Sequence, residues 1–237
     1  MITNCPYVLE SMERANQDVM VFRFRSQTKQ VVDFTSGMFA MLTYKDTSTG
    51  EQISRAYSIA NAPPSDYFEF MIATIHGQMT SKLEAAKLGD IYYISAPYGQ
   101  FKFDIKKCKK CLFISGGTGL APFFSVLRYA KGIGEVIDAN MLYSIKYPYE
   151  MVNKSELDSL ASAGLKFTIT VTRPQPGDGW TGPTGHIDAE MIKKCAPDFA
   201  ERACYICGPP NFVKALKDII IGMGVDEKKI MAEMWGA

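Results

Sequence analysis

The hydrophobic pattern of this chain changes near residue 105, and this change limits the possible folds more than any other feature of the sequence. Before it, short apolar runs are separated by polar turns. In Val19 to Arg25, for example, Phe22 and Phe24 alternate with charged side chains, as in a strand with one buried face. Short strands with frequent turns predict a closed or nearly closed antiparallel barrel.

The other elements expected in this first part are strands and one helix. The strands are Gly37 to Tyr44, Arg55 to Ala60, Tyr67 to Ala73 and Ile91 to Ser95, and the helix is Met79 to Lys87.

After Lys110, short apolar segments alternate with longer amphipathic ones. The expected strands are Cys111 to Ser115, Ala139 to Ile145, Lys166 to Thr172, Cys204 to Cys207 and Ile230 to Met234. The expected helices are Leu120 to Lys131, Ser155 to Ala163, Asp188 to Lys194 and one spaced by Phe212, Leu216, Ile220 and Met223. This alternation predicts a parallel sheet covered on both faces. We therefore expect two domains, residues 1–105 and 106–237, which the length of 237 residues allows.

Composition excludes several classes of protein. Lys and Arg number 26 against 25 for Asp and Glu, and this balance argues against a dedicated nucleic-acid binder. No apolar run approaches the ~18 residues of a membrane-spanning helix. The first residues lack the basic and apolar pattern of a signal peptide, so we expect a cytoplasmic protein with six reduced cysteines.

A glycine-rich turn joins the first strand of the second part to its helix. It runs from Ser115 through Gly117 and Gly119 to Pro122. Glycines there let backbone amides and the positive helix end approach a phosphate, and proline suits the first helical turn. The dinucleotide spacing is incomplete, and no Lys-Ser or Lys-Thr follows, which excludes a triphosphate-binding loop. The turn alone leaves phosphate binding and a plain tight turn equally open.

Further segments fall in order around this turn. They are Arg55-Ala-Tyr-Ser58, Gly77-Gln-Met-Thr80, Pro97-Tyr-Gly-Gln-Phe101 and Cys207-Gly-Pro-Pro210. Together they resemble the ferredoxin–NADP reductase superfamily over nearly the whole chain, with a closer likeness to its bacterial flavodoxin or ferredoxin reductases and its oxygenase or flavin reductases. The resemblance implies a six-stranded antiparallel barrel that binds FAD, followed by a five-stranded, Rossmann-like parallel sheet that binds NAD(P)H.

The resemblance also implies roles in the FAD-binding part. Arg55 can offer a charge-assisted fork to the pyrophosphate, and Thr80 with nearby amides would meet the same phosphates. Tyr57 would lie flat on the isoalloxazine, and Ser58 would bond near the flavin N5. The other expected FAD contacts are Ile59, Ala60, Gly77 and Met79.

In the second part, Thr118 with its neighbours Gly117 and Gly119 resembles the pyrophosphate cradle for NAD(P)H. The resemblance brings Cys207 close to the nicotinamide C4, although a buried structural cysteine is the common alternative. The other expected contacts with the coenzyme are Gly208, Pro209, Ser144, Lys146 and Arg173. The two cations, without an acidic residue after the second strand, favour NADPH slightly over NADH.

The tail Glu233-Met-Trp235 has the spacing of the Glu-x-Tyr end of plant-type members. Trp235 would then stack on the flavin and move aside for nicotinamide, whereas the alternative is a tryptophan that closes the sheet edge. Glu233 would hydrogen-bond near Cys207 and Ser58 and help pass a proton. Ser58, Cys207, Glu233 and Trp235 are thus the expected catalytic residues.

Two cysteine pairs, Cys108 with Cys111 and Cys204 with Cys207, have a spacing found in metal sites. Residues three apart on a strand face opposite sides, so the second pair cannot chelate one ion, and we expect no metal. The lysines beside Cys108 form either a docking site for an acidic carrier or a solvated linker. They are Lys106, Lys107, Lys109 and Lys110.

These features predict an NAD(P)H-dependent flavoprotein reductase in which hydride passes from nicotinamide C4 to flavin N5. The acceptor would be an iron–sulfur protein, a flavodoxin, an oxygenase component or free flavin. The alternative is a flavin-bearing subunit that relays electrons inside a complex and has little activity alone.

Overall fold

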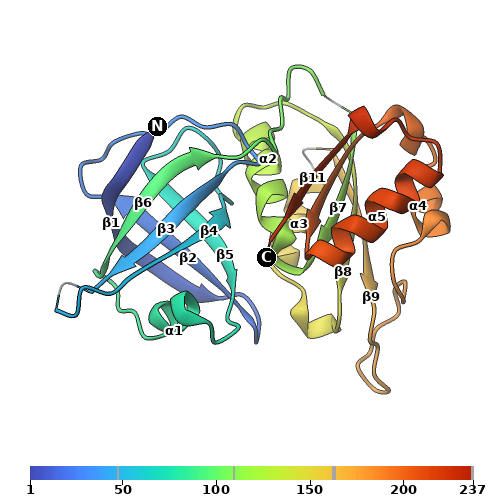
Figure 1. The fold of residues 1–237 in the computed structure, drawn as a ribbon. Coiled ribbons are helices and arrows are strands. Elements are labelled where there is room, and N and C mark those ends of the chain that lie inside the picture. The colour runs from blue at the N-terminus through green and yellow to red at the C-terminus, as the bar shows by residue number, and fades with distance from the viewer. Residues whose placement is uncertain (47, 109, 162–163, 236–237) are drawn as a thin grey trace.

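A computed structural model describes residues 1–46, 48–108, 110–161 and 164–235, and it contains two separate sheets (Figure 1). The first sheet is antiparallel, with six strands in the order β4-β3-β6-β1-β2-β5. Its strands are β1 (Ile2–Arg14), β2 (Val19–Ser26), β3 (Phe39–Lys45), β4 (Gln52–Ser58), β5 (Tyr67–Ala73) and β6 (Ile91–Tyr98). The helix α1 (Gln78–Glu84) lies beside them.

The first sheet curls around an aromatic core, as the alternation in β2 predicts. Phe22 and Phe24 are fully buried. The edge strands β4 and β5 approach each other, since the rings of Tyr57 and Phe70 lie 6.0 Å apart. The expected barrel-like fold is therefore confirmed.

The second sheet is parallel, with five strands in the order β11-β10-β7-β8-β9. Its strands are β7 (Lys110–Gly116), β8 (Asp138–Ile145), β9 (Leu165–Val171), β10 (Ala203–Gly208) and β11 (Ile230–Met234). Its helices are α2 (Ala121–Gly132), α3 (Lys154–Leu160), α4 (Ala189–Cys195) and α5 (Pro210–Gly222). Short 3₁₀ turns are η1 (Gly117–Leu120), η2 (Pro148–Glu150), η4 (Phe199–Glu201) and η5 (Glu227–Lys229).

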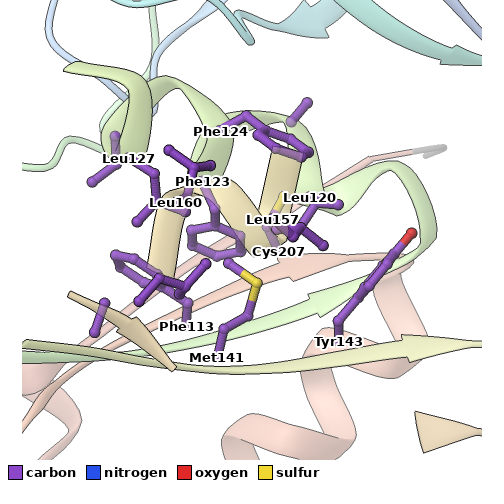
Figure 2. Close-up of a cluster of buried hydrophobic side chains, with 14 of the residues drawn as sticks. Phe113, Leu120, Phe123, Phe124, Leu127, Met141, Tyr143, Leu157, Leu160 and Cys207 are labelled. Carbon is purple, nitrogen blue, oxygen red and sulfur yellow. The ribbon is translucent and has the colours of Figure 1, made fainter. Parts of the chain in front are cut away.

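Helices cover both faces of the second sheet, which confirms the predicted layers. On one face α2 and α3 pack against Phe113 and Met141, and α2 also lies toward the first sheet (Figures 1 and 2). The Phe113 and Phe123 rings stack with centroids 4.7 Å apart. On the other face α4 and α5 bury Ile192 and Leu216.

Three parts of the prediction need comment. The long strand β1 was not predicted from the sequence. Its buried and exposed residues do not alternate regularly from Ile2 to Arg14, so the period-two pattern of a strand is missing. Strand β4 ends at Ser58, two residues earlier than expected. The helix expected from Ser155 to Ala163 runs from Lys154 to Leu160, and residues 162–163 lie outside the described part of the chain.

The segment between the sheets packs into the core of the second one. The ring centroids of Phe101 and Phe103 lie 5.6 and 5.3 Å from that of Tyr205. The boundary near residue 105 therefore stays a prediction. Within the described residues, no helix is long and apolar enough to cross a membrane.

Candidate active site

Three side chains stand in a row at the C-terminal edge of the second sheet. The strand register pairs Ser115 on β7 with Cys207 on β10, and Cys207 with Glu233 on β11. Residues paired in this way point to the same face of a sheet, which here is the face covered by α2. Ligands of open parallel sheets bind at this edge, so the row lies where a nucleotide cofactor would bind.

Glu233 reaches from the second sheet to the first. Its Oε1 lies 3.7 Å from the position that a Cβ would take at Gly99, and the Phe39 ring lies 3.0 Å from the same position. Phe39 pairs with Ser58 across β3 and β4. The carboxyl group thus lies near the strand pair that carries Ser58, and the expected hydrogen bond near Ser58 stays a prediction.

Burial controls the protonation of this row. Desolvation raises the pKa of Glu233 from 4.5 to about 7. Burial, and then the nearby Glu233 charge, raise the pKa of the Cys207 thiol. At neutral pH Cys207 is therefore a neutral thiol, and Glu233 is poised between its two protonation states.

The glycine-rich turn packs closely against the backbone of Cys207 and Gly208. Gly117 has φ +56°, which favours glycine. A Cβ at Gly119 would lie 2.3 Å from the Cys207 carbonyl oxygen, so only glycine fits there. A Cβ at Gly208 would lie 2.7 Å from the Phe212 ring. Thr118, between the two glycines of the turn, is half-buried.

Trp235 lies at this turn. Its backbone N–H donates to the Gly208 carbonyl at 3.2 Å, and its Cζ2 is 3.7 Å from the position of a Cβ on Gly117. The indole therefore covers part of the turn expected to hold NAD(P)H. Its stacking on a flavin stays a prediction.

The residues expected to bind flavin gather on β4 and α1 of the first sheet. Arg55 is exposed, and its guanidinium donates to the Ser54 carbonyl at 2.8 Å and to Gln78 Oε1 at 3.3 Å. Among the described residues it has no carboxylate partner. Tyr57 is half-buried, and burial raises its pKa to about 12, which keeps it neutral. Ile59 and Ala60 are buried just beyond the strand.

Two other expected flavin contacts hold the start of α1. The Thr80 hydroxyl accepts from the Gly77 N–H at 2.8 Å and donates to the Gly77 carbonyl at 3.1 Å. Thr80 and Met79 are both buried. These side chains organise the loop, so a phosphate here would meet backbone amides of the loop more readily than the Thr80 hydroxyl.

The residues expected near the adenosine lie at the C-terminal ends of β8 and β9. The Arg173 N–H donates to the Lys146 carbonyl at 2.8 Å, and both side chains are exposed. Ser144 is buried on the opposite face from Tyr143. Sequence reasoning missed Glu150, whose Oε2 accepts from the Lys146 N–H at 2.7 Å. The turn η2 brings this acidic residue back to the strand end.

The rings of Tyr147 and Tyr149 stack in the same turn, with centroids 5.3 Å apart. In the sequence these two tyrosines stand between Lys146 and Lys154, and such an aromatic pair would have been a usable signal for a purine-binding surface.

The cysteine pairs are arranged as predicted where the structure tests them. Cys207 belongs to the core under α2, whereas Cys204 belongs to the core under α4 and α5. They therefore face opposite sides of the sheet. No group of three or more His, Cys, Asp or Glu residues in the described segments could hold a metal ion.

The lysine run beside Cys108 is partly ion-paired. The Lys110 ammonium lies 2.8 Å from a carboxylate oxygen of Asp198 and 2.7 Å from one of Glu201. The Lys107 ammonium lies 3.5 Å from a carboxylate oxygen of Asp104. Lys109 is outside the described residues. Docking of an acidic carrier on this run stays a prediction.

Unpartnered buried atoms allow a test of whether the site fits the two cofactors. In the described chain, Ser115 Oγ, Glu233 Oε2 and Trp235 Nε1 are buried without a hydrogen-bond partner. Buried polar groups are normally satisfied, and these three lie at one sheet edge. They could bond the polar groups of nicotinamide and flavin, while Arg55 offers a pyrophosphate an exposed guanidinium that has no carboxylate partner among the described residues. The residues present therefore fit FAD and NAD(P)H.

Two family profiles match the chain. The profile described as Oxidoreductase FAD-binding domain matches residues 6–103. The profile described as Oxidoreductase NAD-binding domain matches residues 113–218.

Curated relatives agree with these matches. The glycine betaine monooxygenase reductase subunit of Pseudomonas aeruginosa is 29% identical over 224 residues, which cover 92% of this chain and 61% of that protein. The chain thus spans about three fifths of the length of that relative. NADH-cytochrome b5 reductase 1 of Aspergillus clavatus is 24% identical over 238 residues, which cover 96% of this chain and 77% of that protein.

Solved structures share the fold. The FAD/NAD-binding domain of nitric oxide dioxygenase from Vibrio cholerae superimposes with a TM-score of 0.87 at 19% identity, over 100% of both chains. A ferredoxin NADP⁺ reductase from Neisseria gonorrhoeae superimposes with a TM-score of 0.80 at 21% identity, over 99% of both chains.

Proposed function

Because the chain belongs to the oxidoreductases that combine an FAD-binding domain with an NAD-binding domain, we propose that it is a reductase that takes electrons from NAD(P)H and delivers them to a separate acceptor. One observation carries this proposal: Ser115, Cys207 and Glu233 share one strand-end row, and Glu233 at the end of that row reaches Gly99 and Phe39 of the first sheet, where Phe39 pairs with Ser58. A hydride donor on the second sheet and an acceptor on the first would meet there.

The flavin would lie along β4. FAD would supply the two-electron to one-electron chemistry that nicotinamide lacks. Arg55 would bind the pyrophosphate with a charge-assisted fork, Tyr57 would lie against the ring system, and Ser58 would bond its polar edge. Gly77, Met79 and Thr80 would hold the loop that presents backbone amides to the phosphates, and Ile59 and Ala60 would close the pocket floor.

Glu233 would hold the proton that accompanies electron transfer. A carboxyl group with a pKa near the working pH is an efficient general acid and base. Cys207 would pack against nicotinamide as a neutral thiol, and Ser115 would hydrogen-bond the ring substituents.

The coenzyme would enter across the glycine-rich turn. Gly117, Thr118 and Gly119 would hold its pyrophosphate beside Gly208 and Pro209. Trp235 covers the turn and would have to move first.

The charges after β8 would select between NADPH and NADH. Lys146 and Arg173 would attract a 2′-phosphate, whereas Glu150 at the same strand end would repel it. Because both cations are exposed side chains, we propose that they favour NADPH. Replacing both by alanine should then lower the ratio of kcat/KM for NADPH to that for NADH, and Glu150→Gln should raise it. If neither variant moves the ratio, this part of the proposal is wrong.

The acceptor would be an oxygenase component or another small redox protein, since the first relatives include a monooxygenase reductase subunit. The alternative is a relay subunit with little activity of its own. All six cysteines are free in the structure, which suits a reducing compartment such as the cytoplasm.

The test is FAD binding and NAD(P)H-dependent dye reduction by the purified protein. The proposal expects a yellow protein that reduces dye. A yellow protein without dye reduction would favour the relay subunit, and a protein that takes up no FAD would overturn both. Arg55→Ala should lose FAD more readily, whereas the control Arg14→Ala should retain it.

A further inference from the structure

A chain of ion pairs joins the first sheet to the helices that cover the second. Arg23 on β2 donates to Glu69 on β5 at 2.8 Å, and Arg128 on α2 donates to the other oxygen of Glu69 at 2.5 Å. Arg128 also donates to both oxygens of Glu156 on α3, at 2.6 and 2.7 Å. Arg128 thus bridges a carboxylate of the first sheet and a carboxylate of the layer that covers the second.

Arg128 also contacts the backbone of the expected flavin segment. Its Nη1 donates to the Ala60 carbonyl at 2.9 Å. One turn earlier on α2, Ser125 Oγ donates to the Asn61 carbonyl at 2.8 Å. Ser36 Oγ in turn donates to the Ser125 carbonyl at 3.2 Å. Three bonds therefore fix α2 to the segments on either side of β3 and β4.

The helix that carries Arg128 begins at the glycine-rich turn. η1 runs directly into α2, so the turn and Arg128 belong to one continuous helical segment. Ala60 lies two residues after Ser58, which ends β4, the strand that also carries Arg55. Arg128 therefore connects the part expected to hold NAD(P)H with the part expected to hold FAD.

The burial of this network argues against a role in stability alone. The Glu69 side chain is 6% exposed and that of Arg128 20%. A buried ion pair recovers little more than its desolvation cost, so an apolar pair of the same size would hold the layers together equally well. What the charged network adds is geometric: a planar guanidinium with fixed donors admits one arrangement of Glu69, Glu156 and the Ala60 carbonyl.

We propose that Arg128 is a positioning residue, which sets the distance and orientation between the hydride donor on the second sheet and the acceptor on the first. This rests on the proposed function. Arg128 is not itself among the residues proposed to contact either cofactor, and it acts through α2 and through the backbone carbonyl of Ala60. Hydride transfer is sensitive to such placement, because a displacement of about 1 Å by a distant mutation can cost about 100-fold in rate.

The test compares Arg128→Met with a matched control, Arg202→Met. Arg202 is also a buried arginine between two carboxylates, Asp138 and Asp198, but it lies within the second sheet at the opposite strand ends. The readouts on FAD-loaded protein are the flavin reduction rate at saturating NAD(P)H, its primary deuterium isotope effect and the coenzyme Kd. Urea unfolding measures the stability lost in each variant.

We expect Arg128→Met to slow flavin reduction by tenfold or more, with an altered isotope effect and a Kd within about threefold of the wild type. Arg202→Met should lose stability but keep the wild-type reduction rate. Arg128→Lys keeps the charge without the fork and should fall between; it serves as the test if the methionine variant does not fold. Equal reduction rates in the Arg128 variants and the wild type would overturn the inference, as would an equal loss in Arg202→Met.

Failure of the proposed function would look different. In that case the wild-type protein itself would bind no FAD or would not be reduced by NAD(P)H.

Discussion

Replacing Glu233 by glutamine should make folding stability less sensitive to pH. Burial raises the pKa of Glu233 from 4.5 to about 7 in the folded protein. Below pH 4.5 the group is protonated in both states and burial costs nothing. As the pH rises toward 7, the unfolded chain releases the proton and the folded chain does not, so stability falls. At 1.36 kcal/mol per pH unit the full loss is about 3 kcal/mol.

Glutamine stays neutral, so Glu233→Gln avoids this loss. The variant should exceed the wild type by about 1 kcal/mol at pH 5 and by about 3 kcal/mol at pH 8. For a chain of this length that corresponds to a melting-temperature difference of roughly 10 °C at pH 8. Urea unfolding followed by tryptophan fluorescence at pH 5, 6, 7 and 8 measures the difference. Glu190→Gln is the control, because that side chain is 82% exposed. A wild-type-to-variant difference that is the same at pH 5 and pH 8 would refute the reasoning.

Further predictions follow from the same contacts. Gly119→Ala should cost about 1–3 kcal/mol in urea unfolding, because its Cβ would meet the Cys207 backbone, whereas Gly132→Ala, with open space around it, should be nearly neutral. Trp235→Ala uncovers Gly117 and should lower the KM for NAD(P)H severalfold; unchanged affinity and turnover would remove Trp235 from the site. The neighbouring Cys111 thiol lowers the pKa of Cys108, whereas burial raises that of Cys195, so Cys108 should react with iodoacetamide at pH 7.5 several-fold faster than Cys195. Peptide mass spectrometry of the alkylated cysteines checks this, and equal rates at the two cysteines would contradict it.

The second sheet could be predicted from the sequence because its signals are local. Each buried parallel strand is a short apolar run, and each helix that covers it has its own periodicity. The glycine-rich turn carries its own constraint, since the close approach of Gly119 to the Cys207 carbonyl forbids any side chain. Local rules of this kind gave all five strands of the second sheet to within a residue or two at each end.

The first sheet is only partly visible in the sequence. β1 lies between β6 and β2, but its outward face is polar and irregular, so alternation does not reveal it. Thr80 resembles a phosphate contact by position, yet the folded loop uses its hydroxyl to hold Gly77. Glu150 follows the end of β8 by several residues, and only the turn η2 brings it back to Lys146. In each case a neighbour in space, not in sequence, decides what the side chain does.

The same distinction separates the cofactor-binding motifs from the contacts that align them. Arg55, Cys207 and Glu233 stand in recognisable local patterns, and the resemblance places them without a structure. Arg128 has no such pattern: on an amphipathic helix it would be expected to be a solvated cation. Only the packing of α2 against β5 pairs it with Glu69. If hydride passes between the two sheets as proposed, the reaction needs both kinds of residue, because binding each cofactor correctly does not fix the distance between them. On the proposed function, the residues that tune the rate are therefore to be sought among the buried charges between the sheets as well as in the motifs.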